Sequence, residues 1–208
     1  MSPRTSRASS IYGVHPSTEW AHNIIVRMKE KTGRSLDEWV ALVDAQGPVG
    51  EAERTAWLKR EHELGANYAA WIAARSFGKG LDDGDPDAYL RAAPVMVDTM
   101  YDGAKRALRP IHDALVALGR SLGDDVKVCP CATIVPLFRM HVFAQIKPST
   151  RTRIDLGLAL GDRAATGRLI DTGGRAKKDR ITHRVAMATL ANVDAEVEAW
   201  MRAAYERK

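Results

Sequence analysis

The sequence lacks the features that mark several large classes of protein. Cys129 and Cys131 are the only cysteines in 208 residues, which is too few for a disulfide framework. No apolar run approaches the roughly 20 residues that a membrane-spanning helix needs. Arg4 and Arg7 are not followed by an apolar stretch of signal-peptide length. We therefore expect a cytoplasmic protein without a membrane partner.

Catalytic and cofactor motifs are missing as well. The chain contains no G-x-S-x-G, no G-x-G-x-x-G and no H-E-x-x-H. Cys129 and Cys131 are the nearest candidates for a metal or redox site, with His141 as a third ligand. On a strand, such a pair lies at about the upper distance limit for a disulfide, and no second C-x-C or H-x-H pair completes a zinc site. We therefore expect reduced cysteines, no metal and no cofactor, and we assign no catalytic residue; whether the chain is an enzyme stays open.

What the chain does have is an uneven distribution of charge. Its 45% hydrophobic and 27% charged content are ordinary for a packed globular protein, and its net charge is only +5. Residues 126–190, however, hold twelve basic residues against four acidic ones, so the positive excess is confined to this segment. Such a local basic field favours an anionic partner, although solubility alone also explains it.

The N-terminal part of the chain is rich in helix signals. Ser35 and Glu38 form a capping-box pattern, and apolar residues follow from Trp39 onward with helical spacing. Four of the five tryptophans lie in this region, which provides enough aromatic surface for a small core. We predict an all-helical module over residues 10–77, preceded by a flexible tail over residues 1–9.

A change of periodicity divides the rest of the chain. Residues 78–85 form a predicted Gly/Asp-rich linker, and residues 86–122 form predicted helices interrupted by prolines. Beyond Gly123 the apolar period changes to two, which predicts short strands, and residues 193–205 carry the apolar stripe of a C-terminal helix. The predicted fold class is therefore α+β: a small all-helical N-terminal module, followed by an α+β domain over residues 86–208 with a mainly antiparallel sheet packed on the C-terminal helix.

The predicted hairpin around Pro148 is the most informative stretch. Ala144, Ile146 and Ile154 must face the same core, because a slip of one residue would turn one set to solvent. A three-residue loop that begins at Pro148 satisfies this condition. It pairs Ile146 with Thr152 and Ala144 with Ile154.

This register has a consequence on the opposite face of the sheet. It sets Lys147 opposite Arg151 and Gln145 opposite Arg153, and it exposes Phe143 as a platform on which a nucleic-acid base can stack. A basic face with one aromatic side chain suits a phosphate, a carboxylate or a nucleic-acid backbone. The alternative is a solvated sheet face whose long side chains cover Phe143.

A second basic stretch covers residues 172–184 and begins with two glycines. Its backbone N–H groups and its cations, Arg175 among them, can wrap an anion, although the glycines lack the spacing of a P-loop. The alternative is a flexible charged loop. The candidate anion-binding residues of the two stretches are Arg139, His141, Lys147, Arg151, Arg153, Lys177, Lys178 and Arg180.

Several stretches resemble known families. The N-terminal stretches are S-I-Y-G-V-H-P-S, E-K-T-G-R-S-L-D-E-W and A-W-L-K-R-E-H-E-L-G-A-N-Y-A, and they resemble the bacterial domain-of-unknown-function family 4287. The C-terminal stretches are V-C-P-C-A-T-I-V-P-L-F-R, H-V-F-A-Q-I-K-P-S-T-R-T-R-I-D-L-G-L and I-D-T-G-G-R-A-K-K-D-R-I-T-H-R, and they resemble family 5655. Relatives of the second family occur attached to nuclease-like or restriction-associated proteins, which implies a nucleic-acid setting. Neither family supplies an established active site.

Three functional hypotheses follow. The leading hypothesis is non-enzymatic binding of a polyanion, with nucleic acid as the preferred partner, through the basic sheet face and the second basic stretch. The second is an enzyme or small-molecule-binding protein whose pocket lies at the domain junction, with polar groups from His141, Arg151, Arg153 and Tyr68. The third is an adaptor that docks a partner protein through the tryptophan-rich helical module.

Overall fold

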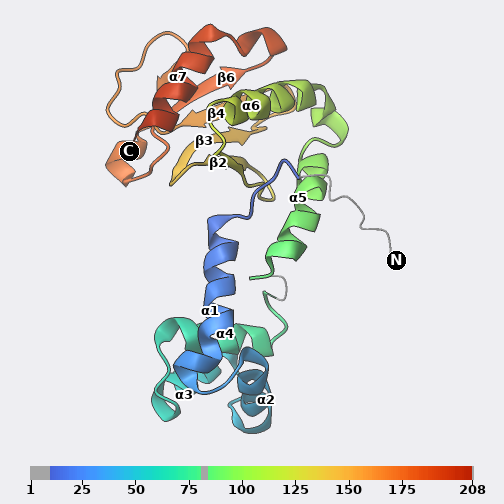
Figure 1. The fold of residues 1–208 in the computed structure, drawn as a ribbon, viewed down its shortest axis with the longest axis vertical. Helices are drawn as coiled ribbons and strands as arrows, with labels where there is room; N and C mark the ends of the chain where they lie inside the picture. The colour runs from blue at the N-terminus through green and yellow to red at the C-terminus, as the bar shows by residue number, and fades with distance from the viewer. Residues whose placement is uncertain (1–9, 81–83, 208) are drawn as a thin grey trace. The chain divides into compact units, whose positions relative to one another are not determined.

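The computed structural model describes residues 10–80 and 84–207. The predicted tail over residues 1–9 lies outside this range, as do residues 81–83 of the predicted linker. The elements follow the order that the change in periodicity predicts, with helices first, then a sheet, then a C-terminal helix (Figure 1). None of the helices in the described part of the chain combines the length and the apolar character needed to cross a bilayer.

The chain divides into two compact units. Pro16–Tyr89 make up the first, and the segment up to His15 joins the chain from Leu90 onward in the second. The N-terminal segment belongs with the second unit because Tyr12 forms a parallel bridge with Val128.

The first unit is a bundle of short helices. They are α1 (Pro16–Thr32), α2 (Leu36–Gln46), α3 (Glu51–Glu61) and α4 (Ala66–Ser76). The predicted capping box is confirmed, because Glu38 N donates to Ser35 Oγ over 3.3 Å and Ser35 N donates to Glu38 Oε2 over 2.6 Å. Met28, Leu58 and Ile72 are fully buried at the centre of this unit.

Two of the four tryptophans in this unit, Trp39 and Trp57, pack in or against its core. Trp39 is buried and donates its indole N–H to Thr32 Oγ1 over 2.7 Å. Trp20 differs, because it meets Trp71 edge-on at a ring separation of 6.4 Å and keeps 49% of its surface exposed. A single edge contact at the rim of a small bundle cannot cover an indole ring.

The second unit is an antiparallel sheet with two helices packed against it. The first residues of α5 (Pro86–Met100) belong to the first unit and the rest to the second. The elements that follow are η1 (Gly103–Leu108), α6 (Arg109–Ser121), β1 (Lys127–Val128), β2 (Val135–Phe138), β3 (Val142–Lys147), β4 (Ile154–Leu158), β5 (Ile170–Asp171), η2 (Gly174–Lys177), β6 (His183–Met187), η3 (Leu190–Asn192) and α7 (Ala195–Glu206). The strand order is β1-β2-β3-β4-β6-β5, and every neighbouring pair is antiparallel. The predicted α+β fold class is therefore confirmed.

Helices α6 and α7 cover the same face of this sheet (Figure 1). Gly119 of α6 allows the close approach, because a Cβ there would lie 2.5 Å from a methyl group of Leu137 and 3.8 Å from the sulfur of Met201. Ile146, Leu156 and other core-facing strand residues are buried beneath the two helices. Burial of this apolar face is the main source of stability for the unit.

The β3–β4 register differs from the predicted one. Ile146 pairs with Leu156, four residues further along than the predicted partner Thr152, and Ala144 pairs with Leu158. The shift is even, so the same side chains still face the core, and the apolar pattern cannot distinguish the two registers. The longer loop is held in part by a distant contact, because Lys105 Nζ donates to Pro148 O over 2.8 Å.

The predicted exposure of Phe143 is wrong. The register between β2 and β3 shifts at this point: Leu137 pairs with Ala144 and Phe138 pairs with Val142, so Phe143 is the extra residue of a β-bulge. Its side chain is 3% exposed and meets the ring of Tyr205 in α7 edge-on, with the centroids 5.6 Å apart. Phe143 therefore belongs to the helix-covered side of the sheet and offers no stacking platform on the open face.

His112 of α6 is a polar exception in the core of the second unit. Its imidazole is 2% exposed and packs against the ring of Tyr101, with the centroids 4.7 Å apart. Within the described residues, His112 Nδ1 has no hydrogen-bond partner. Burial lowers the pKa of His112 to about 4, and the nearby Asp113 only partly opposes this effect. The imidazole is therefore neutral in the folded protein at neutral pH.

We predict that His112 makes the second unit sensitive to acid. The unfolded chain binds a proton at His112 below pH ~6.5, while the folded chain resists protonation down to about 4. Stability is therefore lost as the pH falls through this window, by about 3 kcal/mol. The free energy of unfolding can be measured at each pH from urea-dependent hydrogen exchange of the β4 amides. It should fall with pH in this window for the wild type and depend less on pH in His112→Leu. His141→Gln, which removes an exposed histidine, is the control, and an unchanged profile in His112→Leu contradicts the prediction.

Candidate functional site

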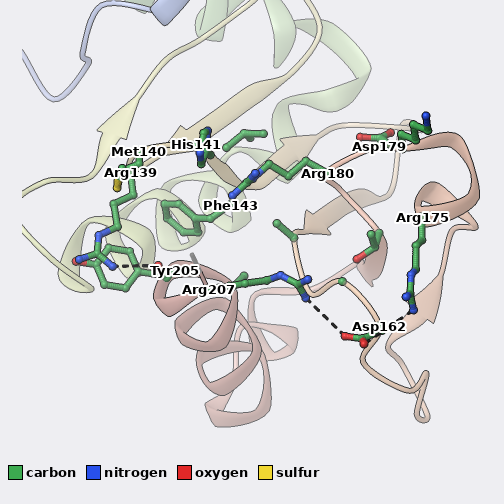
Figure 2. A pocket seen from close by; sticks show the side chains of 16 residues that line it. Arg139, Met140, His141, Phe143, Asp162, Arg175, Asp179, Arg180, Tyr205 and Arg207 are labelled. Atoms are coloured by element: carbon green, nitrogen blue, oxygen red, sulfur yellow. Dashed lines mark hydrogen bonds and ion pairs between the residues drawn. The ribbon is translucent and has the colours of Figure 1, made fainter.

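A pocket of about 530 Å³ opens in the second unit, where β3 begins and β4 ends. The loop that carries η2 and the C-terminal end of α7 complete its wall (Figure 2). The cations that line it are Arg139, Arg175, Lys178, Arg180 and Arg207, and the carboxylates are Asp162 and Asp179. Part of the remaining wall is apolar, formed by Val142, Phe143, Ala159 and Ala204. The lining is therefore positively charged on balance and partly hydrophobic.

The pocket brings together parts of both predicted basic stretches. Of the candidate site residues, those that line it are Arg139, His141, Phe143, Lys178 and Arg180. The candidates that do not line it are Lys147, Arg151, Arg153 and Lys177. Arg139, His141 and Phe143 precede or open β3. Lys147, by contrast, is the last residue of β3, and Arg151 and Arg153 follow that end of the strand.

The expected row of cations on the open sheet face does not form. Lys147 pairs with Asp155 in the β3–β4 ladder, not with Arg151, which lies in the loop between the strands. Arg153 and Arg184 both form ion pairs with Asp155, at 3.0 and 3.4 Å. A half-buried carboxylate therefore offsets part of the positive charge on this face.

Arg139 is held at the pocket wall by a tight set of contacts. Its Nε donates to Asp125 Oδ2 over 2.8 Å, and its guanidinium lies 4.5 Å from the centroid of the Tyr205 ring. Tyr205 Oη donates to the other oxygen of Asp125 over 2.7 Å. These hydrogen bonds, that of Tyr205 first, hold the pKa of the Asp125 carboxyl below its usual range. Arg139 thus forms part of the pocket wall, and its guanidinium is already paired with the Asp125 carboxylate.

Arg180 is the opposite case. Its side chain points into the pocket in the direction of Phe143 (Figure 2). Within the part of the chain that the structure describes, neither an ion pair nor a side-chain hydrogen bond engages this guanidinium. An arginine that lies in a pocket without a carboxylate partner is free to take an anion from outside.

The loop that presents Arg180 is ordered by its own backbone. Asp179 N donates to Gly174 O over 2.8 Å, and Asp179 Oδ1 accepts from Ile181 N over 3.1 Å. Gly173 and Lys178 both adopt the left-handed conformation, at φ 68° and 56°. These turns set the direction in which Lys178 and Arg180 leave the chain.

Three polar residues of the pocket lie outside both basic stretches that the sequence analysis singled out. Asp162 follows β4 after a turn at Gly161, while Tyr205 and Arg207 come from the end of α7. The apolar stripe of α7 indicates which face packs on the sheet, but it carries no signal for where the helix ends over that sheet. Only the packing of α7 across the sheet brings these side chains to the pocket.

The two cysteines lie outside this pocket. Cys129 is buried and its Sγ lies 3.6 Å from Val14 O, while Cys131 is half-buried and burial raises the pKa of its thiol. Both are free thiols, so they do not form the disulfide considered for a C-x-C pair. Within residues 10–80 and 84–207, no three His, Cys, Asp or Glu side chains come together as a metal site would require.

We predict that Tyr205→Phe raises the pKa of the Asp125 carboxyl toward its ordinary value of about 3.9. The variant removes the hydrogen bond that lowers this pKa most and leaves that of Arg139 in place. Asp125 stabilises the fold above its unfolded pKa, and this contribution disappears as the pH falls through its folded pKa. The titration can be followed by NMR from the chemical shift of the side-chain carboxyl carbon. Tyr68→Phe, in the other unit, is the control; identical Asp125 titrations in Tyr205→Phe and wild type count against the assignment.

Comparison with known proteins places the pocket within a family. The domain of unknown function DUF5655 matches residues 97–208, and the domain of unknown function DUF4287 matches residues 20–76. No curated protein and no solved structure matches the chain. All the residues that line the pocket fall within the first match. Because this match covers more than half of the sequence, the chain belongs to the DUF5655 family, and it carries a DUF4287 region before that domain.

Proposed function

We propose that this chain is a binding protein that takes an anionic ligand in the pocket of its DUF5655 domain. The observation that carries the proposal is Arg180, whose guanidinium points into the pocket without a carboxylate partner among the described residues. Lys178 and His141 line the same space. A phosphate or carboxylate group of the ligand binds this cluster through charge-assisted hydrogen bonds.

The shape and composition of the pocket support a compact ligand over a flat polyanion surface. Its volume of about 530 Å³ is within the usual range for small-molecule sites, which is ~300–1,000 Å³. The wall formed by Val142, Phe143 and Ala204 provides apolar contact beside the cations. The ligand is therefore an organic anion with an apolar part.

We predict that Arg180→Gln weakens anion binding while Arg151→Gln does not. Inorganic phosphate and phenyl phosphate serve as probes, titrated at low salt and followed by backbone NMR shifts of the η2 loop. Loss of a hydrogen bond to a charged group weakens binding by roughly 10–100-fold. Arg151 is an exposed arginine outside the pocket, so its variant matches the change in charge. Equal binding by wild type and Arg180→Gln, or no binding by the wild type, overturns the proposal.

Nucleic acid is a second candidate ligand. The excess of basic residues between 126 and 190 favours it, as do the exposed cations Lys147, Arg151 and Lys177 outside the pocket. A strand with one nucleotide in the pocket would need these outer cations for its neighbouring phosphates, and single-strand sites span ~4–16 nucleotides. Dependence of binding on these outer cations therefore distinguishes a single-stranded nucleic acid from a small anion.

We predict, for the nucleic-acid candidate, that a Lys147→Gln/Arg151→Gln double variant binds single-stranded oligonucleotides less tightly. Each phosphate contact contributes a slope of about −0.7 to the dependence of log K on log salt for single strands. The slope should therefore be shallower by about 1.4 in the double variant. Fluorescence anisotropy of a labelled oligonucleotide across a salt series measures it. Wild-type affinity and slope in the double variant, or no binding at low salt, exclude this candidate.

A further inference from the structure

A second cationic position lies in the same pocket, on a different side from the tip of Arg180 (Figure 2). Arg175, from η2, and Arg207, from the end of α7, both point at the carboxylate of Asp162. Each of these ion pairs measures 3.9 Å. Two guanidinium groups from distant parts of the chain therefore converge on a space that one anionic group fills.

The carboxylate in this space is held loosely. A charge-assisted hydrogen bond measures about 2.7–2.9 Å, so 3.9 Å is a long-range attraction without a hydrogen bond. The side chain of Asp162 is 72% exposed. By contrast, Arg168 in the same unit contacts both oxygens of Asp194 at 2.8 Å, as a structural ion pair does. Asp162 therefore offsets part of the charge of the two arginines without holding their side chains through hydrogen bonds.

Arg207 reaches this position because Gly161 has no side chain. The guanidinium of Arg207 lies where a Cβ of residue 161 would be, and Gly161 adopts φ +65°, a conformation that other residues rarely adopt. The pocket lining also includes the apolar side chains of Phe143 and Ala159. The pocket thus carries two cationic positions with an apolar surface beside them.

We propose that the ligand of this pocket carries two separated anionic groups, and that Asp162 fills the place of the second group when the pocket is empty. This inference rests on the proposed function, since Arg180 is taken to bind the first group. When the ligand binds, its second group displaces the Asp162 carboxylate from Arg175 and Arg207. The ligand class is therefore an organic dianion of the bisphosphate or dicarboxylate type, with an apolar spacer.

The test compares ligands with one and two anionic groups. Alkane bisphosphonates with linkers of increasing length are titrated beside the matching alkyl monophosphonates, and the matching dicarboxylates show whether carboxylate suffices. We expect the best-fitting bisphosphonate to bind about tenfold or more tightly than its monophosphonate. Arg207→Gln should abolish this advantage, so that the bisphosphonate binds no more tightly than its monophosphonate. Arg202→Gln, which changes an exposed arginine of the same helix outside the pocket, should preserve the advantage.

Asp162→Asn provides an independent readout. Without a carboxylate to displace, the variant should bind the bisphosphonate several-fold more tightly than the wild type, about threefold or more. Asp179→Asn removes a carboxylate from the same pocket that bonds to Ile181 N instead of the two arginines, and it should have a smaller effect. Weaker binding by Asp162→Asn, or equal gains in both variants, overturns the inference.

Failure of this inference is distinguishable from failure of the proposed function. If monophosphonates bind in an Arg180-dependent way and no bisphosphonate binds more tightly, only the second anionic position is refuted. If neither class of ligand binds, both proposals are refuted.

Discussion

The pairing of β3 with β4 is the constraint on which the rest of the second unit depends. With Ile146 opposite Leu156 and Ala144 opposite Leu158, the two strands bury their apolar sides under α6 and α7. The same pairing brings the end of β4 to the start of β3, where Ala159 N donates to Phe143 O over 2.9 Å. The pocket lies at this junction, so a different register would move its lining residues on β3 and β4 away from one another.

The tertiary structure also decides which cations are available. Near the loop end of the hairpin, Asp155 forms ion pairs with Arg153 and Arg184 and offsets part of their charge. At the opposite end, Arg180 extends into the pocket without such a partner in the described chain. A count of basic residues along the sequence cannot separate these cases, because the availability of a cation depends on its neighbours in space.

Short-range patterns were sufficient to predict most of the secondary structure. The capping box at Ser35 forms as predicted because its hydrogen bonds join residues three positions apart. In β6, His183 alternates with Val185 and Met187, and all three are fully buried, as a period of two predicts. For Phe143 the same alternation fails, since one bulge reverses the side on which a side chain lies.

By itself, the sequence determined the α+β class, the order of the elements and, away from the bulge at Phe143, the side chains of the hairpin that face the core. These features depend on local hydrogen bonds and on a period of two or 3.6. Only the tertiary structure decided which part of β4 pairs with β3 and which cations share a pocket. Registers that differ by two or four residues bury the same side chains, so the choice is made by distant contacts such as that of Lys105 with Pro148. The end of α7 adds Arg207 to the pocket for a similar reason, because the packing of the helix against β3 and β4 brings that end beside the pocket.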